Sequence, residues 1–222
     1  MPDTATSTVF VVDDDEAMRH SIHWLLQSVN LTSEMYATAQ DFLSGYSPDQ
    51  PGCLLLDVRM PGMSGLELLD HLQAKHVDIP VIIMTGNGDI PMAVRALKNG
   101  ALDFVPKPFN SQEMLDRIQC ALRLDQESRA RHYGKQDLYE RLARLTPRET
   151  EILEHIKSGK SSKFVARELG ISPKTVDVHR AHIMRKLNIH HAVELGSLSD
   201  ARFHLEPGSH VDQPSVGIYR VK

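Results

Sequence analysis

The 222-residue chain contains only two cysteines and no long apolar run. Cys53 and Cys120 are too few for a disulfide framework or for a structural zinc site. The longest apolar runs, such as residues 81–84, fall far short of the roughly 20 residues that a membrane helix needs. The first residues also lack the basic, apolar and cleavage regions of a signal peptide. We therefore expect a cytoplasmic protein that has no membrane partner.

Charge is distributed unevenly along the chain, although the formal net charge is only −4. Residues 1–124 carry 8 basic and 16 acidic side chains, a balance of −8. Residues 141–200 carry 11 basic and 7 acidic side chains, a balance of +4. An acidic segment joined to a basic one is typical of a regulatory or metal-binding module attached to a module that touches a polyanion.

The first 120 residues alternate short apolar runs with longer amphipathic stretches, which predicts an α/β fold with a parallel sheet covered by helices. Strands are predicted at residues 9–12, 53–56 and 81–84, which are apolar enough to be central, and at 34–37 and 103–105, which suit flanking positions. Helices are predicted at residues 17–29, 39–45, 65–75, 91–99 and from 111 onward. The last helix is expected to continue as a helical linker over residues 125–141.

Residues 142–200 show a helical pattern only. Thr146 and Glu149 form a capping box around a proline at the first helical position. Further helices are predicted at residues 163–169, 173–187 and 191–198, and residues 201–222 are predicted to be a C-terminal tail. A short helix, a turn at Gly170 and a capped helix form a helix-turn-helix pattern, in which the second helix enters the major groove of DNA.

Polar side chains follow four of the predicted strands. Asp13 and Asp14 follow the first strand, and Asp57 follows the third. Ligands of open parallel sheets bind beyond the carboxyl ends of the strands, so these carboxylates are expected to crowd one edge and to need a compensating cation. An all-oxygen cluster suits Mg²⁺. Thr85 and Lys107 follow the fourth and fifth strands, and a hydroxyl and an ammonium beside a metal-loaded acidic cleft are typical of phosphoryl transfer.

Four motifs make residues 7–124 resemble the receiver domain of two-component response regulators. They are DD after the first strand, LLLDVRMPGMSGLELL, IIMTG and FVPKPF. The resemblance implies a doubly wound, flavodoxin-like fold in which Asp57 is the phosphoacceptor. It also implies that Asp14 is a direct Mg²⁺ ligand, that Asp13 is a ligand or a water-mediated neighbour, and that the backbone carbonyl of Arg59 contacts the metal.

The same resemblance implies a switch. Thr85 and Lys107 would bind the phosphoryl oxygens, and Phe104 occupies the position of the switch aromatic, although an ordinary core phenylalanine fits the inactive state equally well. The Lys107–Pro108 peptide bond would be cis, which proline permits. Phosphorylation is then expected to draw Thr85 inward, to let Phe104 rotate and to favour a homodimer on the face that includes the fifth strand.

Residues 142–200 resemble the LuxR-type DNA-binding domain of the NarL/FixJ family. The resemblance rests on the segment LTPRETEILEHIKSGKSSKFVARELGISPKTVDVHRAHIMRKL. The motifs MTGNGDIPMAVRALKNGALDF and SPKTVDVHR are similar to those of the FixJ subfamily. This similarity implies three partners: a sensor histidine kinase, promoter DNA and RNA polymerase.

Residue type suggests how the predicted recognition helix would work. Phosphate contacts are predicted for Lys163, Lys174 and Thr175. Base-edge contacts are predicted for Asp177, Val178, His179 and Arg180. Arg180 suits guanine and Val178 suits a thymine methyl group, whereas Asp177 either accepts from a cytosine amine or positions Arg180 through an ion pair. Core spacing is found at Val176, Ile183 and Leu187.

We therefore expect a response regulator rather than an enzyme, in which a sensor histidine kinase phosphorylates Asp57 to switch transcription, with activation favoured. A phosphatase with an aspartate nucleophile would also place Asp and Mg²⁺ at strand ends, but its D-x-D-x-T/V pattern is broken, because Glu16 and Ala17 follow Asp15. A DNA-binding protein that works independently of phosphorylation is disfavoured, because every residue type of the phosphorylation site is present.

Overall fold

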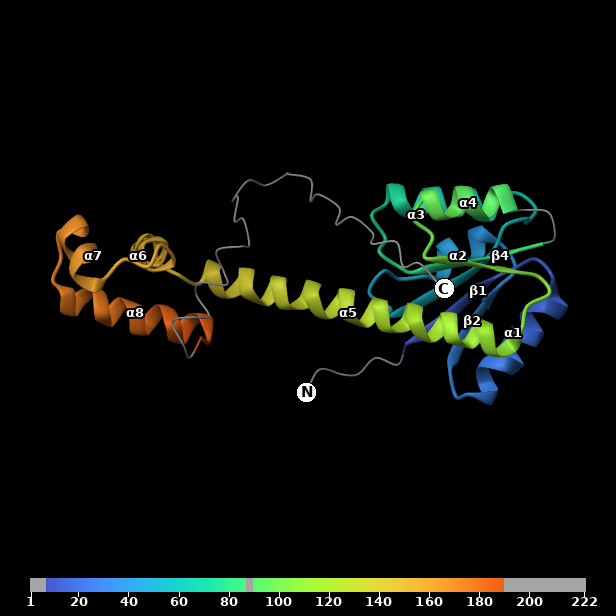
Figure 1. Ribbon diagram of the computed structural model, residues 1–222, viewed down its shortest axis with the longest axis horizontal. Helices are drawn as coiled ribbons and strands as arrows, with labels where there is room; N and C mark the ends of the chain where they lie inside the picture. Colours follow the sequence, from blue (N-terminus) through green and yellow to red (C-terminus); the bar gives the residue numbers. More distant parts are fainter. Residues whose placement is uncertain (1–6, 87–89, 190–222) are drawn as a thin grey trace, which may run out of the picture. The chain divides into compact units, whose positions relative to one another are not determined.

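The computed structural model describes residues 7–86 and 90–189, which form two compact units. The first unit spans residues 1–134 and the second spans residues 135–222. The division falls inside the predicted linker, within one continuous helix (Figure 1). Each unit is described by itself below.

The first unit is a five-stranded parallel sheet with the strand order β2-β1-β3-β4-β5. The strands are β1 (Thr8–Val12), β2 (Thr32–Tyr36), β3 (Gly52–Asp57), β4 (Val81–Thr85) and β5 (Asp103–Pro106). The helices are α1 (Glu16–Ser28), α2 (Ala39–Gly45), α3 (Gly65–Ala74), α4 (Ile90–Lys98) and α5 (Ser111–Ala143). The predicted doubly wound α/β fold is confirmed, and each predicted element lies within a few residues of its observed bounds.

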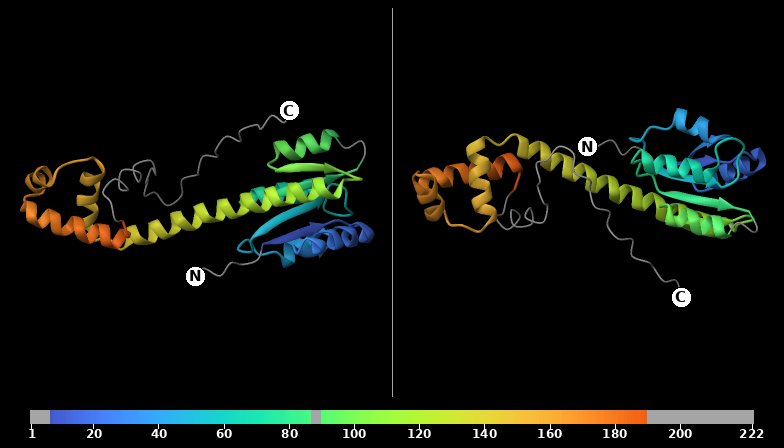
Figure 2. Two further views of the ribbon diagram at one scale, coloured as in Figure 1. Left: turned by 60° about the horizontal axis from the view of Figure 1, so that its bottom comes forward. Right: turned by 90° about the horizontal axis from the view of Figure 1, so that it is seen from above.

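Helices cover both faces of the sheet, as the views in Figure 2 show. On one face, Phe42 of α2, Leu68 of α3 and Ala96 of α4 are buried in one apolar cluster. On the other face, Ile22 of α1 and Ile118 of α5 belong to a second cluster. The three central strands β1, β3 and β4 are buried along their whole length, as their continuous apolar runs predict.

The second unit contains three described helices, α6 (Pro147–Lys157), α7 (Ser162–Leu169) and α8 (Pro173–Leu187). Their shared core includes Ile152, Leu153, Ile156, Val165, Ala166, Val176, Ile183 and Leu187. The predicted capping box is present, since the Thr146 hydroxyl accepts from the Glu149 amide and the Glu149 carboxylate accepts from the Thr146 amide. Gly170 ends α7 in the left-handed conformation, with φ of 65°. The predicted helix at 191–198 and the predicted tail lie outside the described residues.

Helix α5 runs through the whole predicted linker without a break, because Gly134 does not interrupt it. Its middle is attached to the first unit by polar contacts. The buried Asp125 carboxylate accepts a hydrogen bond from the Gly52 amide at 2.9 Å and pairs with Arg129. Arg129 also donates to the carbonyl oxygens of Pro48, Asp49 and Gln50 at 2.9–3.0 Å. Among the described helices, none is long and apolar enough to span a membrane.

Candidate functional site

The register of the sheet brings Asp13 and Asp57 together. Val12 at the end of β1 pairs with Leu56 of the neighbouring strand β3. Asp13 and Asp57 are the next residues along these two strands, so they lie side by side at the carboxyl edge of the sheet. Both are buried, with exposed fractions of 0% and 6%. Two buried carboxylates this close need a positive partner.

Lys107 is that partner. Its backbone is held at the same edge because Thr85 pairs with Pro106, and the Lys107 amide donates to the Thr85 carbonyl oxygen at 2.6 Å. The ammonium group donates to Oδ2 of Asp13 at 2.6 Å and to Oδ1 of Asp57 at 2.5 Å. The Lys107–Pro108 peptide bond is cis. Lys107 thus neutralises part of the acidic charge that predicts a cation at this edge of the sheet.

Burial and pairing act in opposite directions on these groups. Burial raises the pKa of Asp57, and the hydrogen bond from Lys107 opposes this rise only in part. Burial lowers the pKa of Lys107, but the hydrogen bonds to Asp13 and Asp57 outweigh it, so the net pKa is raised. The ammonium therefore stays charged at neutral pH and holds the Asp57 side chain in place.

The segment after β3 completes one wall of the site. The Arg59 amide donates to Oδ2 of Asp57 at 2.7 Å, so both carboxylate oxygens of Asp57 have partners. Ser64 caps α3 in a capping box with Glu67. A Cβ atom at Gly65 would lie 2.0 Å from the Asp57 carbonyl oxygen, so only glycine permits α3 to start this close to the phosphoacceptor candidate.

A pocket of about 300 Å³ opens at this edge of the sheet. Its lining residues are Asp13, Asp14, Asp15, Asp57, Val58, Arg59, Gly86 and Lys107. Within residues 7–86 and 90–189, no group of three or more His, Cys, Asp or Glu side chains is already arranged to hold a metal ion. The donors are nevertheless oxygen atoms with an acidic excess, and Mg²⁺ commonly uses one or two carboxylates and keeps several waters. The donor set therefore fits Mg²⁺.

Two predicted switch residues do not line this pocket. Thr85 ends β4 beside it and is 3% exposed, and its hydroxyl donates to the Gly86 carbonyl oxygen at 3.3 Å. Phe104 is half-buried and packs against the apolar cluster to which α2, α3 and α4 contribute side chains. Asp13, Asp14, Asp57, Arg59 and Lys107, in contrast, all lie together.

Sequence reasoning missed Arg19 of α1. Its guanidinium group donates to the Asp13 carbonyl oxygen at 2.7 Å and so supports the loop that carries the first carboxylates. No spacing rule links the end of a strand to a residue about one turn into the next helix.

The second unit has the geometry of a helix-turn-helix. Helix α7 ends at Leu169, the chain turns through Gly170 and Ile171, and Ser172 caps α8 by accepting from the Thr175 amide. Val176, Ile183 and Leu187 are buried and hold α8 against its neighbours, as their spacing predicts. The amino-terminal end of α8 is the part that such a fold presents to base edges.

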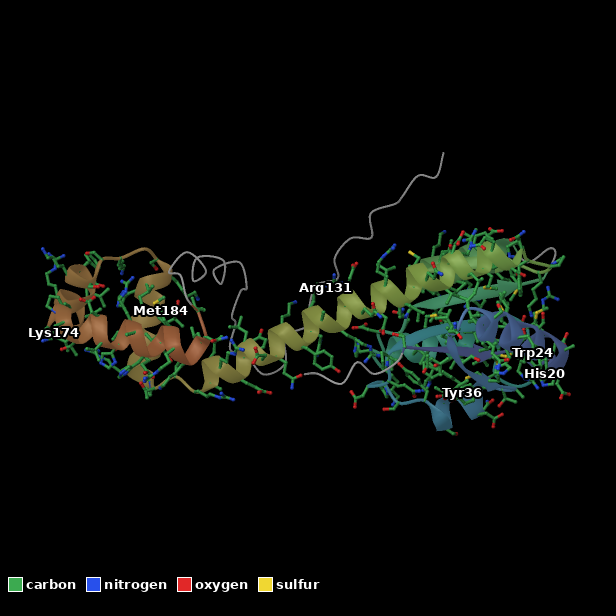
Figure 3. The ribbon with its side chains drawn as sticks, turned by 90° about the horizontal axis from the view of Figure 1, so that it is seen from below. His20, Trp24, Tyr36, Arg131, Lys174 and Met184 are labelled. Carbon is green, nitrogen blue, oxygen red and sulfur yellow. The ribbon has the colours of Figure 1, made fainter. Side chains whose placement is uncertain are left out.

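Most of the predicted DNA contacts are exposed on this end of the unit. Lys163, Lys174, Thr175, Asp177 and Val178 are exposed, and His179 and Arg180 are half-buried. Figure 3 shows Lys174 at the amino-terminal end of α8. Nδ1 of His179 is buried without a hydrogen-bond partner among the described residues. Asp177 makes no ion pair with Arg180 in the described part of the chain; it accepts instead from Ser162, at 2.7 Å.

Comparison with known proteins assigns both units. Residues 9–119 match the response regulator receiver domain family. Residues 143–198 match the luxR family of bacterial regulatory proteins.

Known relatives cover most of the chain. It is 40% identical over 196 residues to the transcriptional regulatory protein FixJ of Bradyrhizobium diazoefficiens, and the aligned region covers 88% of this chain and 96% of that relative. It is 43% identical over 183 residues to the transcriptional regulatory protein TdiR of Thauera aromatica, and the aligned region covers 82% of this chain and 81% of that relative. The solved structure of the response regulator StyR has a TM-score of 0.82 at 44% identity, covering 89% of this chain and 100% of that chain. The chain belongs to the family of response regulators that join a receiver domain to a LuxR-type DNA-binding domain.

Proposed function

We propose that this protein is a phosphorylation-switched transcription factor in which Asp57 accepts a phosphoryl group from a sensor histidine kinase. The observation that carries the proposal is the position of Asp57. Its carboxylate is buried at the carboxyl edge of the sheet, opens on an acidic pocket and is oriented by Lys107 and the Arg59 amide. A lysine and an amide beside a carboxylate are suited to stabilise the three equatorial oxygens of a transferred phosphoryl group.

In the proposed reaction, one Asp57 oxygen attacks the phosphorus atom of a phosphohistidine. A P–O bond forms as the P–N bond breaks, and the imidazole leaves with the bonding electron pair and takes up a proton. Lys107 turns from Asp57 toward the incoming phosphoryl oxygens and keeps its contact with Asp13. A magnesium ion held by Asp13, Asp14, Asp57 and the Arg59 carbonyl would neutralise charge on the transferred group.

The acyl phosphate then acts as a switch. It offers the Thr85 hydroxyl a stronger acceptor than the Gly86 carbonyl oxygen, and the movement of Thr85 gives Phe104 room to rotate. Such a change would bias the face formed by α4, β5 and the start of α5 toward a homodimer. Three hydrophobic side chains, Val94, Leu97 and Leu102, are exposed on α4 and just before β5 and support this choice of face.

On the DNA side, α8 is the recognition helix of the proposed factor. Lys163, Lys174 and Thr175 would contact phosphates, and Asp177, Val178, His179 and Arg180 would face bases of promoter DNA. RNA polymerase is the proposed downstream partner and the cytoplasm the proposed location. Signal transfer rather than turnover of a substrate is the proposed activity, so the protein is not proposed to be an enzyme.

The test is phosphorylation of the full-length chain with labelled acetyl phosphate and Mg²⁺. The wild type is expected to take up label that hydroxylamine removes, and Asp57→Asn is expected to take up none. Asp41→Asn is the matched control, because Asp41 lies on the surface at the first turn of α2. Hydroxylamine-sensitive label on the Asp57→Asn variant would overturn the assignment.

A further inference from the structure

The two helices of the helix-turn-helix are joined by a polar contact at their exposed side. The hydroxyl of Ser162, the first residue of α7, donates to Oδ1 of Asp177 on α8 at 2.7 Å. The neighbouring Ser161 has a different task, since its side chain caps α7 by accepting from the Phe164 amide. Two adjacent serines therefore divide two functions: one closes the helix end and the other reaches across to α8.

This contact leaves one carboxylate oxygen of Asp177 available. Oδ2 of Asp177 has no hydrogen-bond partner among the described residues, and the side chain is exposed. Asp177 lies in the second turn of α8, between Lys174 and Arg180 along the same side of the helix and next to the 49%-exposed Val178. The free oxygen thus belongs to the surface that a recognition helix turns toward base edges.

The side chain of an aspartate at this position must be held in one orientation to contact a base. A carboxylate near a phosphate backbone is repelled unless it meets a hydrogen-bond donor, and in the major groove the cytosine N4 amino group is a suitable donor. An unrestrained exposed side chain would exchange between rotamers and turn away from the groove. A hydrogen bond from the neighbouring helix fixes one oxygen and aims the other, which is how supporting contacts give a binding residue its precision.

We propose that Ser162 is a specificity-positioning residue, which holds Asp177 so that its free oxygen selects cytosine in the target DNA. This inference rests on the proposed function of α8 as the recognition helix. Thymine presents the O4 acceptor where cytosine presents the amino donor, so a fixed carboxylate rejects thymine as well as attracting cytosine. Because water reaches both partners, the Ser162–Asp177 hydrogen bond adds little to folding stability, and its effect should fall on discrimination.

The experiment selects binding sites for the full-length, acetyl-phosphate-treated protein from a pool of duplex DNA with randomised sequence. Wild type, Asp177→Ala, Ser162→Ala, Ser162→Thr and Ser161→Ala are compared, and urea unfolding of each variant is measured alongside. Asp177→Ala is expected to lose a preference for cytosine at one position of the motif. Ser162→Ala is expected to lose the preference at the same position, by roughly 5-fold or more over thymine, while the other positions and the binding to random DNA stay as in the wild type.

The remaining variants separate positioning from stability. Ser162→Thr keeps a hydroxyl and is expected to keep the cytosine preference. Ser161→Ala loses the helix cap and is expected to lower stability while leaving the motif intact. The inference is overturned if Ser162→Ala keeps the full preference, if it weakens all positions equally, or if Asp177→Ala leaves the motif unchanged. A wild-type protein that selects no motif at all overturns the proposed DNA reading itself, and the inference with it.

Discussion

The ammonium nitrogen of Lys107 lies 2.5 Å from Oδ1 of Asp57, and the same group also pairs with Asp13 at 2.6 Å. One half-buried cation thus serves two buried carboxylates. Removing it would leave two acids in a poorly solvated position without the ammonium group that pairs with both, and breaking such a pair costs far more than the pair itself contributes.

The first prediction concerns this cluster. Lys107→Met is expected to lower the free energy of unfolding at pH 7 by about 3–5 kcal/mol, whereas the exposed Lys98→Met should change it by less than about 0.5 kcal/mol. Burial raises the pKa of Asp57 and Lys107 opposes this rise, so without Lys107 the pKa rises further and the charged form of Asp57 opposes folding more strongly than in the wild type. The deficit of Lys107→Met should therefore shrink as the pH is lowered from 7. Urea unfolding followed by circular dichroism measures both effects.

A double-variant cycle completes that measurement. Adding Asp57→Asn to Lys107→Met should restore part of the lost stability, because one uncompensated acid is gone. Strictly additive losses for the two substitutions would show that the pair is not coupled in the folded protein.

A second prediction concerns the contact between α5 and the first unit. Arg129→Ala leaves the buried Asp125 charge and three carbonyl groups without their partner, so it should destabilise the first unit by about 3–5 kcal/mol. Arg131→Ala is the control, since Arg131 is exposed on the same helix, as Figure 3 shows. Hydrogen exchange should also become faster at the Gly52 amide, which donates to Asp125, and along residues 122–134. Equal protection from hydrogen exchange in Arg129→Ala and Arg131→Ala would contradict the structural role assigned to Arg129.

A third prediction is a pH dependence in the second unit. The hydrogen bond from Lys186, together with that from the Thr146 amide, lowers the pKa of the buried Glu149 to about 2, from 4.5. A lowered pKa stabilises the fold above the unfolded value and loses this contribution as the pH falls toward the folded value. The free energy of unfolding of the wild type should therefore exceed that of Glu149→Gln by on the order of 2 kcal/mol at pH 7. This difference should vanish as the pH falls from about 4.5 to about 2.

Hydrogen exchange of α6 and α8 in the full-length chain, compared between variants at each pH, follows this loss locally. Glutamine can still form the capping box, so Glu149→Gln isolates the charge. Glu154→Gln is the surface control, because the Glu154 side chain is 64% exposed. A pH-independent gap between wild type and Glu149→Gln would contradict the linkage.

A fourth prediction separates phosphate contacts from base contacts. Lys174→Ala should weaken binding to all DNA about equally and reduce the salt slope by about 1. Arg180→Ala should cost about 1–3 kcal/mol on the selected site and little on random DNA. Titrations of both variants at several salt concentrations, on selected and random duplexes, decide between these roles. Identical losses on both kinds of DNA would refute the division.

Pattern alone determined much of this protein. The three apolar runs of β1, β3 and β4 predict buried central strands. The capping residues Thr146 and Ser172 predict the starts of two helices of the DNA-binding unit. Because residues that follow parallel strands share one edge, the sequence also predicts that Asp13, Asp57 and Lys107 lie in one site.

Other features were decided only by the tertiary structure. Asp125 and Arg129 read as ordinary linker charges, yet the path of α5 brings them against Gly52, 73 residues away from Asp125. The sequence leaves open whether Asp177 faces a base or pairs with Arg180, and it does not predict Ser162 as a partner, which the packing of α7 on α8 supplies. Residue type and spacing report the neighbours along one element, whereas hydrogen bonds between elements depend on how those elements meet. The buried cores fix how the elements pack, and the spacing of the polar residues along the sequence does not report that packing.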